Sequence, residues 1–299
     1  MGQTALSDFL NHYTLKDNYP DAIHKQLLSW LKRYLIVGGM PEAVMAYAEN
    51  QDFSASERVK QSILNTYQDD FSKYPPPTAL SALRKAFSQL PLLVGQKVKY
   101  SHIDPNAKSA TVAEALTKLS YAGLVYLVKH SACNGVPLGA QVKDKIFKPL
   151  MLDVGLLSTQ LGLSMLNLLR DDALTLINTG AVTEQFIGQH LLYAGPWYEK
   201  PQLYYWVREK KSASAEIDYV VTRNAEPLPI EVKAGKTGTL RSLHYFLQEK
   251  KLSLGVRFNA QMPSLSREQH KLTDGSTVDY QLLSLPLYMV SQLNRLGPA

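Results

Sequence analysis

Apolar residues recur every three or four positions through the first fifty residues, a pattern typical of helices that bury one face. One such face consists of Leu27, Leu28, Leu31 and Leu35. Gly38-Gly39 interrupts the pattern, and Pro41 is well placed to open the next helix because its ring holds the backbone near helical φ. We therefore predict a helical region over residues 1–55.

Residues 56–135 combine helical patterns with one β-type run. Helices are predicted over 57–71 and from about 78 to 90, separated by the stiff Pro75-Pro76-Pro77 segment. The next helix is predicted from a capping-box pattern of Thr111 and Glu114, and Gly123 ends it. Its apolar face consists of Val112, Ala115, Leu116 and Leu119.

A β-type run over 124–128 follows that glycine. The order helix, helix, glycine and strand is typical of a winged helix-turn-helix, in which residues 108–120 would enter a DNA groove. An ordinary packing helix has the same pattern, so both interpretations stay open here.

After residue 136 the sequence pattern predicts strands that alternate with helices. A long helix is predicted over about 178–193. The strands are predicted over 203–208, 216–222, 228–233 and 254–258, with a helix over 240–251 before the last of them. We expect a mixed α+β or α/β chain: a helical region (1–55), a winged-helix-like module (56–135) and a mixed-sheet domain (136–299).

Composition excludes several classes of protein. The chain has 299 residues, of which 45% are hydrophobic and 19% charged, with a mean hydropathy of −0.17, so it is neither disordered nor membrane-embedded. No apolar stretch approaches the ~18 residues of a membrane span, and the first residues do not resemble a signal peptide. Cys133 is the single cysteine, which excludes internal disulfides and a cysteine-rich zinc site. A cytoplasmic protein without a membrane partner is expected.

Positive charge is concentrated in two segments. The net charge is +6, and residues 58–118 contain nine basic and four acidic side chains while residues 205–257 contain ten and six. Such segments suit a phosphate-rich partner such as nucleic acid, although a mildly basic surface explains them equally well. The candidate nucleic-acid-binding residues are Lys97, Lys99, Lys108, Lys118 and Lys236.

A cluster of charged residues on two neighbouring predicted strands carries the candidate chemistry. Asp218 lies within one strand, and Glu231 and Lys233 lie on one face of the next because side chains alternate. If the strands pair, Asp218 joins that face. Two carboxylates are hard ligands suited to Mg²⁺, with Mn²⁺ as a substitute, and Lys233 can orient a water. Glu184 on the preceding helix is a candidate third carboxylate.

This strand pair resembles the core of the PD-(D/E)XK, restriction-endonuclease-like superfamily, in which Glu184 would match the acidic residue of the first helix. The chain also resembles the C-terminal part of a family of prokaryotic AAA-type ATPases that end in a domain of unknown function. The resembling stretches are 34–44, 153–157, 183–186, 216–220 and 229–235. Ile217 stands where the superfamily pattern has a proline.

The resemblance implies an ATPase domain as a partner, in cis or in trans, with residues 1–55 as the end of its lid or a linker. It also implies a metal site at Asp218 and Glu231, completed by the Val232 carbonyl, and catalysis by Asp218, Glu231, Lys233 and Glu184. The chain has no GxxxxGK[ST] motif, because Ile230 stands where the first glycine would precede Gly235-Lys236-Thr237, so no bound nucleotide is expected.

Three functions remain open at this point. The first is a DNA-binding protein with a Mg²⁺-dependent phosphodiesterase domain. The second is a non-enzymatic adaptor that binds nucleic acid or protein through a degenerate nuclease fold. The third is a module that binds only proteins.

Overall fold

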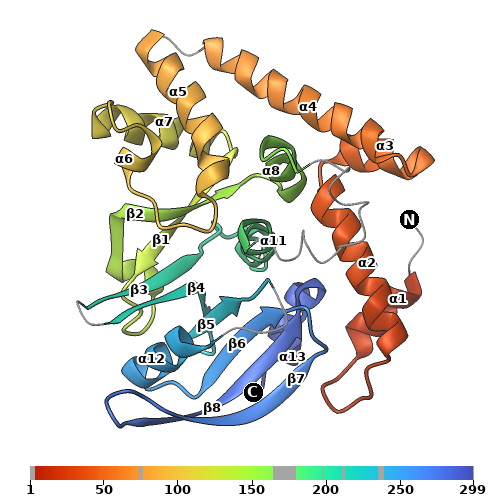
Figure 1. Cartoon of the computed structure of the whole chain (residues 1–299), viewed down its shortest axis with the longest axis vertical. Coiled ribbons are helices and arrows are strands. Elements are labelled where there is room, and N and C mark those ends of the chain that lie inside the picture. The colour runs from red at the N-terminus through yellow and green to blue at the C-terminus, as the bar shows by residue number, and fades with distance from the viewer. Residues whose placement is uncertain are drawn as a thin grey trace. The chain divides into compact units, whose positions relative to one another are not determined.

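The computed structural model describes residues 4–73, 77–163, 180–196, 198–210, 213–234 and 239–298 (Figure 1). Its helices are α1 (Thr4–His12), α2 (Asp21–Val37), α3 (Pro41–Asn50), α4 (Phe53–Asp70), α5 (Pro77–Gln89), α6 (Tyr100–Ile103), α7 (Ser109–Tyr121), α8 (Val154–Gln160), α11 (Gly180–Leu192), α12 (Arg241–Lys250) and α13 (Leu293–Leu296). None of these described helices combines the length and the apolar character that crossing a membrane requires.

The strands are β1 (Val125–Ser131), β2 (Val142–Met151), β3 (Tyr204–Lys210), β4 (Ala213–Arg223), β5 (Glu226–Val232), β6 (Leu254–Asn259), β7 (Ser264–Lys271) and β8 (Thr277–Pro286). In the described chain they form one mixed sheet of eight strands in the order β2-β1-β3-β4-β5-β6-β8-β7. The expectation of a mixed α+β chain, helical at its N-terminus with a sheet towards its C-terminus, is confirmed.

The chain divides into two compact units. Unit 1 consists of Met1–Leu31, Lys129–Asp144 and His190–Ala299, and unit 2 of Lys32–Val128 and Lys145–Gln189. The boundaries predicted at residues 55 and 135 do not coincide with this division, and residue 55 lies inside α4. The chain instead changes unit within α2, β1, β2 and α11.

Unit 2 buries apolar side chains of α4, α5, α7, α8 and the start of β1 in one core. The predicted apolar face of α7 is buried, and Gly123 ends the helix in a left-handed conformation (φ +72°). The predicted capping box is wrong. Helix α7 begins at Ser109, where the Lys108 carbonyl already accepts from the Thr111 and Val112 amides, and the Lys108 side chain makes no cap.

Asp153 connects the α2–α3 turn to α8 within unit 2. One carboxylate oxygen accepts from the amides of Gly155 (2.8 Å) and Leu156 (3.0 Å), which caps α8, and the other accepts from the Gly39 amide (2.8 Å). Gly38 has φ +77°, so the predicted glycine break between the two helices is confirmed. The arrangement is close: a Cβ on Gly155 would lie 2.6 Å from the Gly38 Cα.

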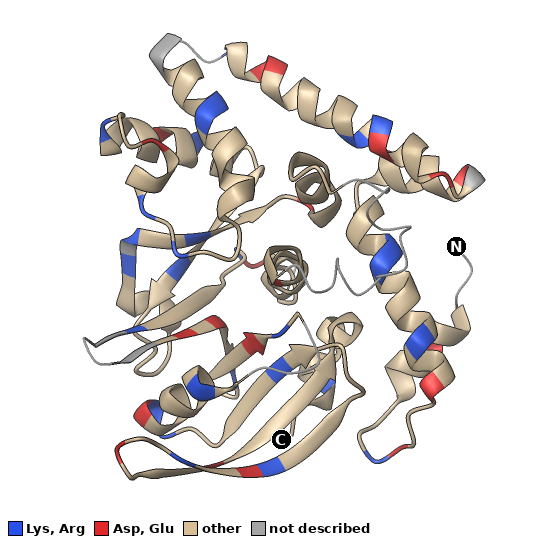
Figure 2. Cartoon of the chain, in the orientation of Figure 1, with Lys and Arg blue, Asp and Glu red and all other residues tan. Residues whose placement is uncertain are grey.

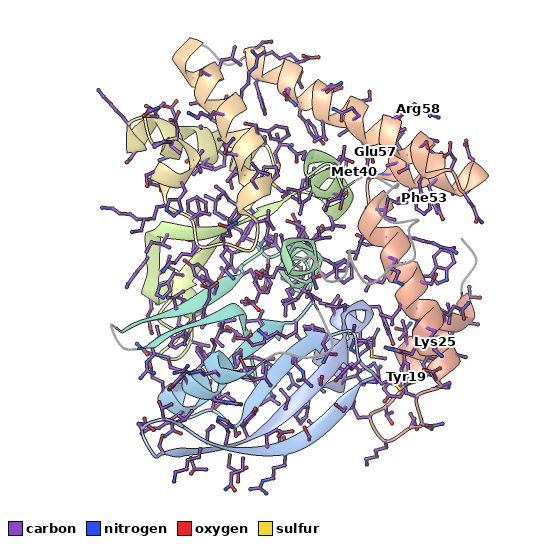
Figure 3. All side chains as sticks on the ribbon, viewed as in Figure 1. Tyr19, Lys25, Met40, Phe53, Glu57 and Arg58 are labelled. Carbon is purple, nitrogen blue, oxygen red and sulfur yellow. The ribbon has the colours of Figure 1, made fainter. Side chains whose placement is uncertain are left out.

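The carbonyls at the end of α2 receive side-chain donors. Ser158 donates to the Leu35 carbonyl (2.9 Å) and the buried Lys60 ammonium donates to the Ile36 carbonyl (2.7 Å). Lys60 is also paired with Glu57 of α4 (2.8 Å; Glu57 is labelled in Figure 3). These bonds satisfy helix-end carbonyls that have no partner inside the helix.

Unit 1 contains the run of strands β3, β4, β5, β6 and β8, with α12 packed against β4, β5, β6 and β8 (Figure 1). Strand β4 is antiparallel to β3 and β5, whereas β5, β6 and β8 are parallel. The predicted strands of this region are confirmed. The hairpin of β7 and β8 was not predicted. Strand β7 is an exposed edge strand (SLSREQHK) without an apolar face, whereas β8 alternates exposed and buried positions and was overlooked.

Packing of α12 places a histidine pair between the helix and the hairpin. His244 is bonded through Nε2 to the Tyr280 hydroxyl (2.9 Å), and its ring stacks on His270 with centroids 4.1 Å apart. Burial, with a smaller electrostatic contribution from the neighbouring His270, lowers the pKa of His244 to about 4. The ring is therefore neutral at physiological pH and belongs to the core.

Because the Asp153 turn leaves no room for a side chain, Gly155→Ala should lower the free energy of unfolding by about 1–3 kcal/mol. The atoms that a methyl group would meet are backbone atoms of Val37 and Gly38, which cannot rotate away. Gly180→Ala is the matched control, since a Cβ at this helical position meets nothing within 4 Å. Urea denaturation of the two variants and the wild type measures the difference; equal stabilities would contradict the close packing.

Candidate active site

Strands β4 and β5 form the hairpin that carries the predicted cluster. Asn224 and Ala225 both have positive φ (49° and 61°), as a two-residue turn between twisted strands requires. Tyr219 pairs with Ile230, and the next position on each strand is Asp218 and Glu231. The prediction that these two strands pair is therefore confirmed.

A β-bulge in β4 changes the direction of the Asp218 side chain. Tyr204 of β3 pairs with Val220 and Trp206 pairs with Ile217, so two residues of β4 lie opposite a single residue of β3. The Asp218 carboxylate accepts a hydrogen bond from the Val232 amide (2.8 Å). Bulges bend a strand and redirect side chains, and here the carboxylate reaches the end of β5.

Glu231 and Lys233 form the second half of the cluster. The Glu231 side chain is only 3% exposed and its carboxylate is paired with the Lys233 ammonium at 2.6 Å. Lys233 lies one residue beyond β5, yet its amide donates to the Phe258 carbonyl of β6 (2.8 Å). Because Asp218 and Lys233 are half-buried while Glu231 is buried, the cluster has both a solvated side and an anchored side.

The carboxylate oxygens of the cluster are ligands of the kind that a hard cation prefers. Mg²⁺ is commonly held by one or two carboxylates while substrate oxygens and waters complete its shell, and the hydrogen bond to Asp218 orients one carboxylate. Asp218 and Glu231 fit this pattern. In the described residues no group of three or more His, Cys, Asp and Glu side chains is arranged to hold a metal, so a cage made entirely of protein ligands is not formed there.

Glu184 is placed differently from the other candidates. It lies on α11 in unit 2, where its carboxylate is paired at 3.2 Å with Lys148 of β2, whose side chain is 2% exposed. The neighbouring Gln185 donates to the Met151 carbonyl and accepts from the Met151 amide, both at 2.8 Å. These contacts fix α11 against β2 within unit 2 and explain Glu184 as a partner for a buried cation.

The candidate lysines separate into groups. Lys97, Lys99 and Lys108 are exposed in the segments around α6, and Figure 2 shows the basic positions of the chain in blue. Lys118 is paired with Glu114 one helical turn away (2.8 Å). Lys236 lies outside the described residues.

Sequence reasoning missed a polar row beside the cluster. Glu231 is in register with Arg257 of β6, and Arg257 is in register with Ser284 of β8. Asn259, two residues after Arg257, is buried and donates to the Ser284 hydroxyl (3.2 Å). The available signal was the polar residues at the ends of otherwise apolar strands.

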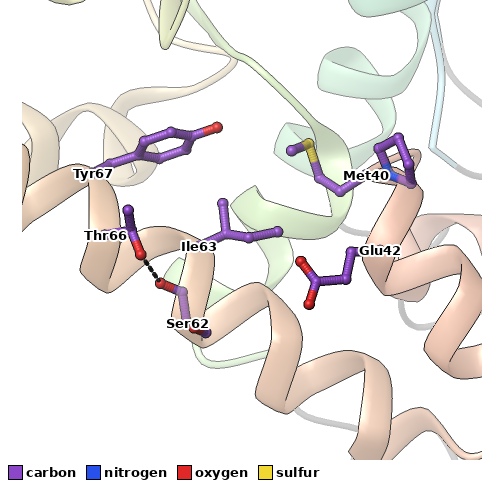
Figure 4. Close-up of a pocket in the computed structure, with 7 residues that line it drawn as sticks. Met40, Glu42, Ser62, Ile63, Thr66 and Tyr67 are labelled. Carbon is purple, nitrogen blue, oxygen red and sulfur yellow. Dashed lines mark hydrogen bonds between the residues drawn. The ribbon is translucent and has the colours of Figure 1, made fainter.

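A pocket of about 430 Å³ lies in unit 2 between the start of α3 and α4 (Figure 4). Its lining consists of Met40, Pro41, Glu42, Ser62, Ile63, Thr66 and Tyr67. Glu42 is the one ionised group in this lining, so the pocket does not assemble acid–base or metal chemistry.

Two family models match this sequence. Domain of unknown function (DUF8612) matches residues 28–167, and Domain of unknown function (DUF4143) matches residues 179–278. The expectation that the C-terminal part carries a domain of unknown function is confirmed, and the second match includes Asp218, Glu231 and Lys233. No curated protein and no solved structure matches the chain.

The buried pair in unit 2 predicts a stability effect. Glu184→Leu should lower the free energy of unfolding by about 3–5 kcal/mol, since it leaves the Lys148 ammonium buried without this carboxylate. The double variant Lys148→Met with Glu184→Leu should recover much of that loss, because both charges are then removed. Denaturant titration of the wild type, both single variants and the double variant measures the coupling; additive effects would contradict a structural pair.

Proposed function

We propose that the chain binds nucleic acid and that its unit 1 hydrolyses phosphodiester bonds in a Mg²⁺-dependent reaction. The observation that carries the proposal is the bulged hairpin, which directs Asp218 to the end of β5 beside the Glu231–Lys233 pair. The resemblance to the PD-(D/E)XK superfamily rests on this strand pair, and the observed pairing of β4 with β5 supports it.

Each residue of the cluster has a role in this proposal. Asp218 and Glu231 would hold the cation with their carboxylates, and the Val232 carbonyl would be an additional ligand. A bound Mg²⁺ would neutralise phosphate charge and activate a water. Lys233 positions the attacking water with its ammonium group, which the Glu231 carboxylate holds at 2.6 Å. The Val232 amide keeps the Asp218 carboxylate turned towards β5.

The nucleic-acid-binding part of the proposal concerns unit 2. Helices α5, α6 and α7 precede β1 and β2, and Val98 between α5 and α6 forms an antiparallel bridge with Phe147 of β2. This order supports a winged helix, in which α7 is the helix that enters a groove. Lys97, Lys99 and Lys108 would contact backbone phosphates.

An ATPase domain, in cis or in trans, is the proposed protein partner. Its support is the resemblance of the chain to the C-terminal part of AAA-type ATPases that end in a domain of unknown function. The match of residues 179–278 to such a domain is in keeping with it. Nucleotide chemistry would then belong to that partner domain.

A structural polar cluster is the second candidate, and it makes the protein a non-enzymatic adaptor. Two observations favour it: Glu184 is paired with Lys148 in unit 2, and Lys233 is already paired with Glu231. In this version the chain binds nucleic acid or protein, without metal-dependent cleavage.

Substitution of Asp218 separates the two candidates. Asp218→Asn should weaken Mg²⁺ and Mn²⁺ binding and slow DNA cleavage by more than about 100-fold, because a neutral amide replaces one of two anionic ligands. DNA affinity should change by less than about threefold. Calorimetric metal titration and a cleavage assay on one plasmid substrate give these quantities.

Asp279→Asn is the matched control, as Asp279 is an exposed carboxylate paired with Arg267 in the β7–β8 hairpin. Metal binding and cleavage that are equal in the wild type and Asp218→Asn would rule out the active site. A wild type that neither binds metal nor cleaves DNA would favour the adaptor.

The lysine surface predicts a change in salt dependence. Replacing Lys97, Lys99 and Lys108 with Gln should reduce the slope of log affinity against log salt by about 2–3, since each lost phosphate contact releases about 0.9 counterions fewer. The control is Gln at Lys16, Lys25 and Lys271, which are exposed lysines outside the two basic segments 58–118 and 205–257. Fluorescence anisotropy on a labelled duplex at several KCl concentrations measures both slopes, and equal slopes would exclude Lys97, Lys99 and Lys108 from the interface.

A further inference from the structure

Polar side chains from two parallel strands meet on a single oxygen atom in unit 1. The Arg257 guanidinium donates through Nε and Nη2 to the Ser284 hydroxyl, each at 3.1 Å. The Asn259 amide donates to the same hydroxyl at 3.2 Å. Ser284 and Asn259 are each 1% exposed, whereas Arg257 is half-buried.

This hydroxyl cannot satisfy all three donors. A serine oxygen has two acceptor lone pairs, so three N–H groups exceed its capacity. Asn259 cannot turn its carbonyl to the hydroxyl at no cost, because its Oδ1 already accepts from the Gln261 amide at 3.0 Å. The group therefore has more donors than acceptors, and a further acceptor would complete it.

The charge of the group also favours an anionic acceptor. Arg257 contributes a positive charge, and none of the ion pairs in the described chain includes it. The other described arginine of the neighbouring hairpin, Arg267, is paired with Asp279 at 2.8 Å. An oxyanion would bind this half-buried guanidinium more strongly than the neutral hydroxyl does, because charge-assisted hydrogen bonds are about twice as strong as neutral ones.

The position of the group links it to the carboxylate cluster. Arg257 is the register partner of Glu231, so its side chain starts from the neighbouring strand and the same sheet face. Strands β5, β6 and β8 are parallel, and the group lies near their carboxyl ends, where open sheets bind ligands. An anion held by Arg257 would therefore lie beside the carboxylates.

We infer that Arg257, Asn259 and Ser284 form a phosphate-binding subsite that holds a backbone phosphate of the nucleic acid beside Asp218 and Glu231. The identity of that phosphate rests on the proposed function; the anion site itself rests on the donors. Arg257 supplies the charge and the planar fork, Asn259 adds an N–H donor, and Ser284 holds both until the phosphate oxygens replace its hydroxyl. Arg257 is thus the residue that binds the phosphodiester group directly.

Inorganic phosphate in the presence of EDTA is the probe, because its binding requires neither metal nor cleavage. Calorimetry on the full chain should show saturable binding that Arg257→Gln weakens by at least about tenfold. Arg257→Lys should give an intermediate affinity, since an ammonium keeps the charge without the fork. Arg267→Gln, which removes an exposed and paired arginine, should leave phosphate affinity unchanged.

Ser284→Ala distinguishes a subsite from a structural bond. If the hydroxyl only occupies the donors until phosphate arrives, its removal should leave phosphate affinity equal or higher. If phosphate binding is lost in Ser284→Ala, or is equal in Arg257→Gln and the wild type, or is absent from the wild type, the subsite is overturned.

The experiments can reject the phosphate subsite and the proposed hydrolase function independently of each other. Phosphate binding that depends on Arg257 in a chain without metal binding or cleavage would retain the subsite and reject the hydrolase. Cleavage that depends on Asp218, without any phosphate binding that depends on Arg257, would retain the hydrolase and reject the subsite. A single-turnover cleavage rate that falls in Arg257→Gln while Mg²⁺ affinity is unchanged would support both.

Discussion

One hydrogen bond, from the Val232 amide to the Asp218 carboxylate, determines the geometry of the candidate site. It forms where the ladder between β4 and β5 would otherwise continue, and it is accessible to Asp218 because the bulge opposite β3 adds a residue to β4. The same strand ends then place Glu231 beside Arg257 through the parallel pairing of β5 with β6. A change of register by one residue would turn each of these side chains to the opposite face of the sheet.

Charged groups in the interior serve two different purposes in this chain. In unit 2, Lys60 and Lys148 are each held by acceptors that match them, a carbonyl with Glu57 for the first and Glu184 for the second. Such pairs offset the cost of burying the charges. In unit 1, Glu231 and Lys233 form a comparable pair, but the half-buried Asp218 carboxylate lies beside it and Arg257 is in none of the ion pairs of the described residues.

The close approach of two backbone segments at Gly38 and Gly155 leaves no room for a larger residue at either position. Gly38 requires positive φ, and Gly155 approaches it so closely that Asp153 can bond to both the α2–α3 turn and α8. The stretches 34–44 and 153–157 are thus two sides of a single contact within unit 2.

Local patterns were sufficient for most elements and for the core of the site. Periodicity located α2, α5, α7 and β3 to β6, because each buries a regular apolar face, and alternation alone put Glu231 and Lys233 on one side. Patterns failed for β7, which is an exposed edge strand. They also failed for the start of α7, where the Lys108 carbonyl, and not a side chain, accepts the hydrogen bonds of the first amides.

Spacing along the chain could not assign partners that are distant in sequence. The pairing of Glu184 with Lys148 and the convergence of Arg257, Asn259 and Ser284 were decided only by the tertiary structure. The sequence by itself determined which residues are apolar, charged or turn-forming and hence the local elements. Sheet order and register decided which charges meet, since those contacts join segments tens of residues apart.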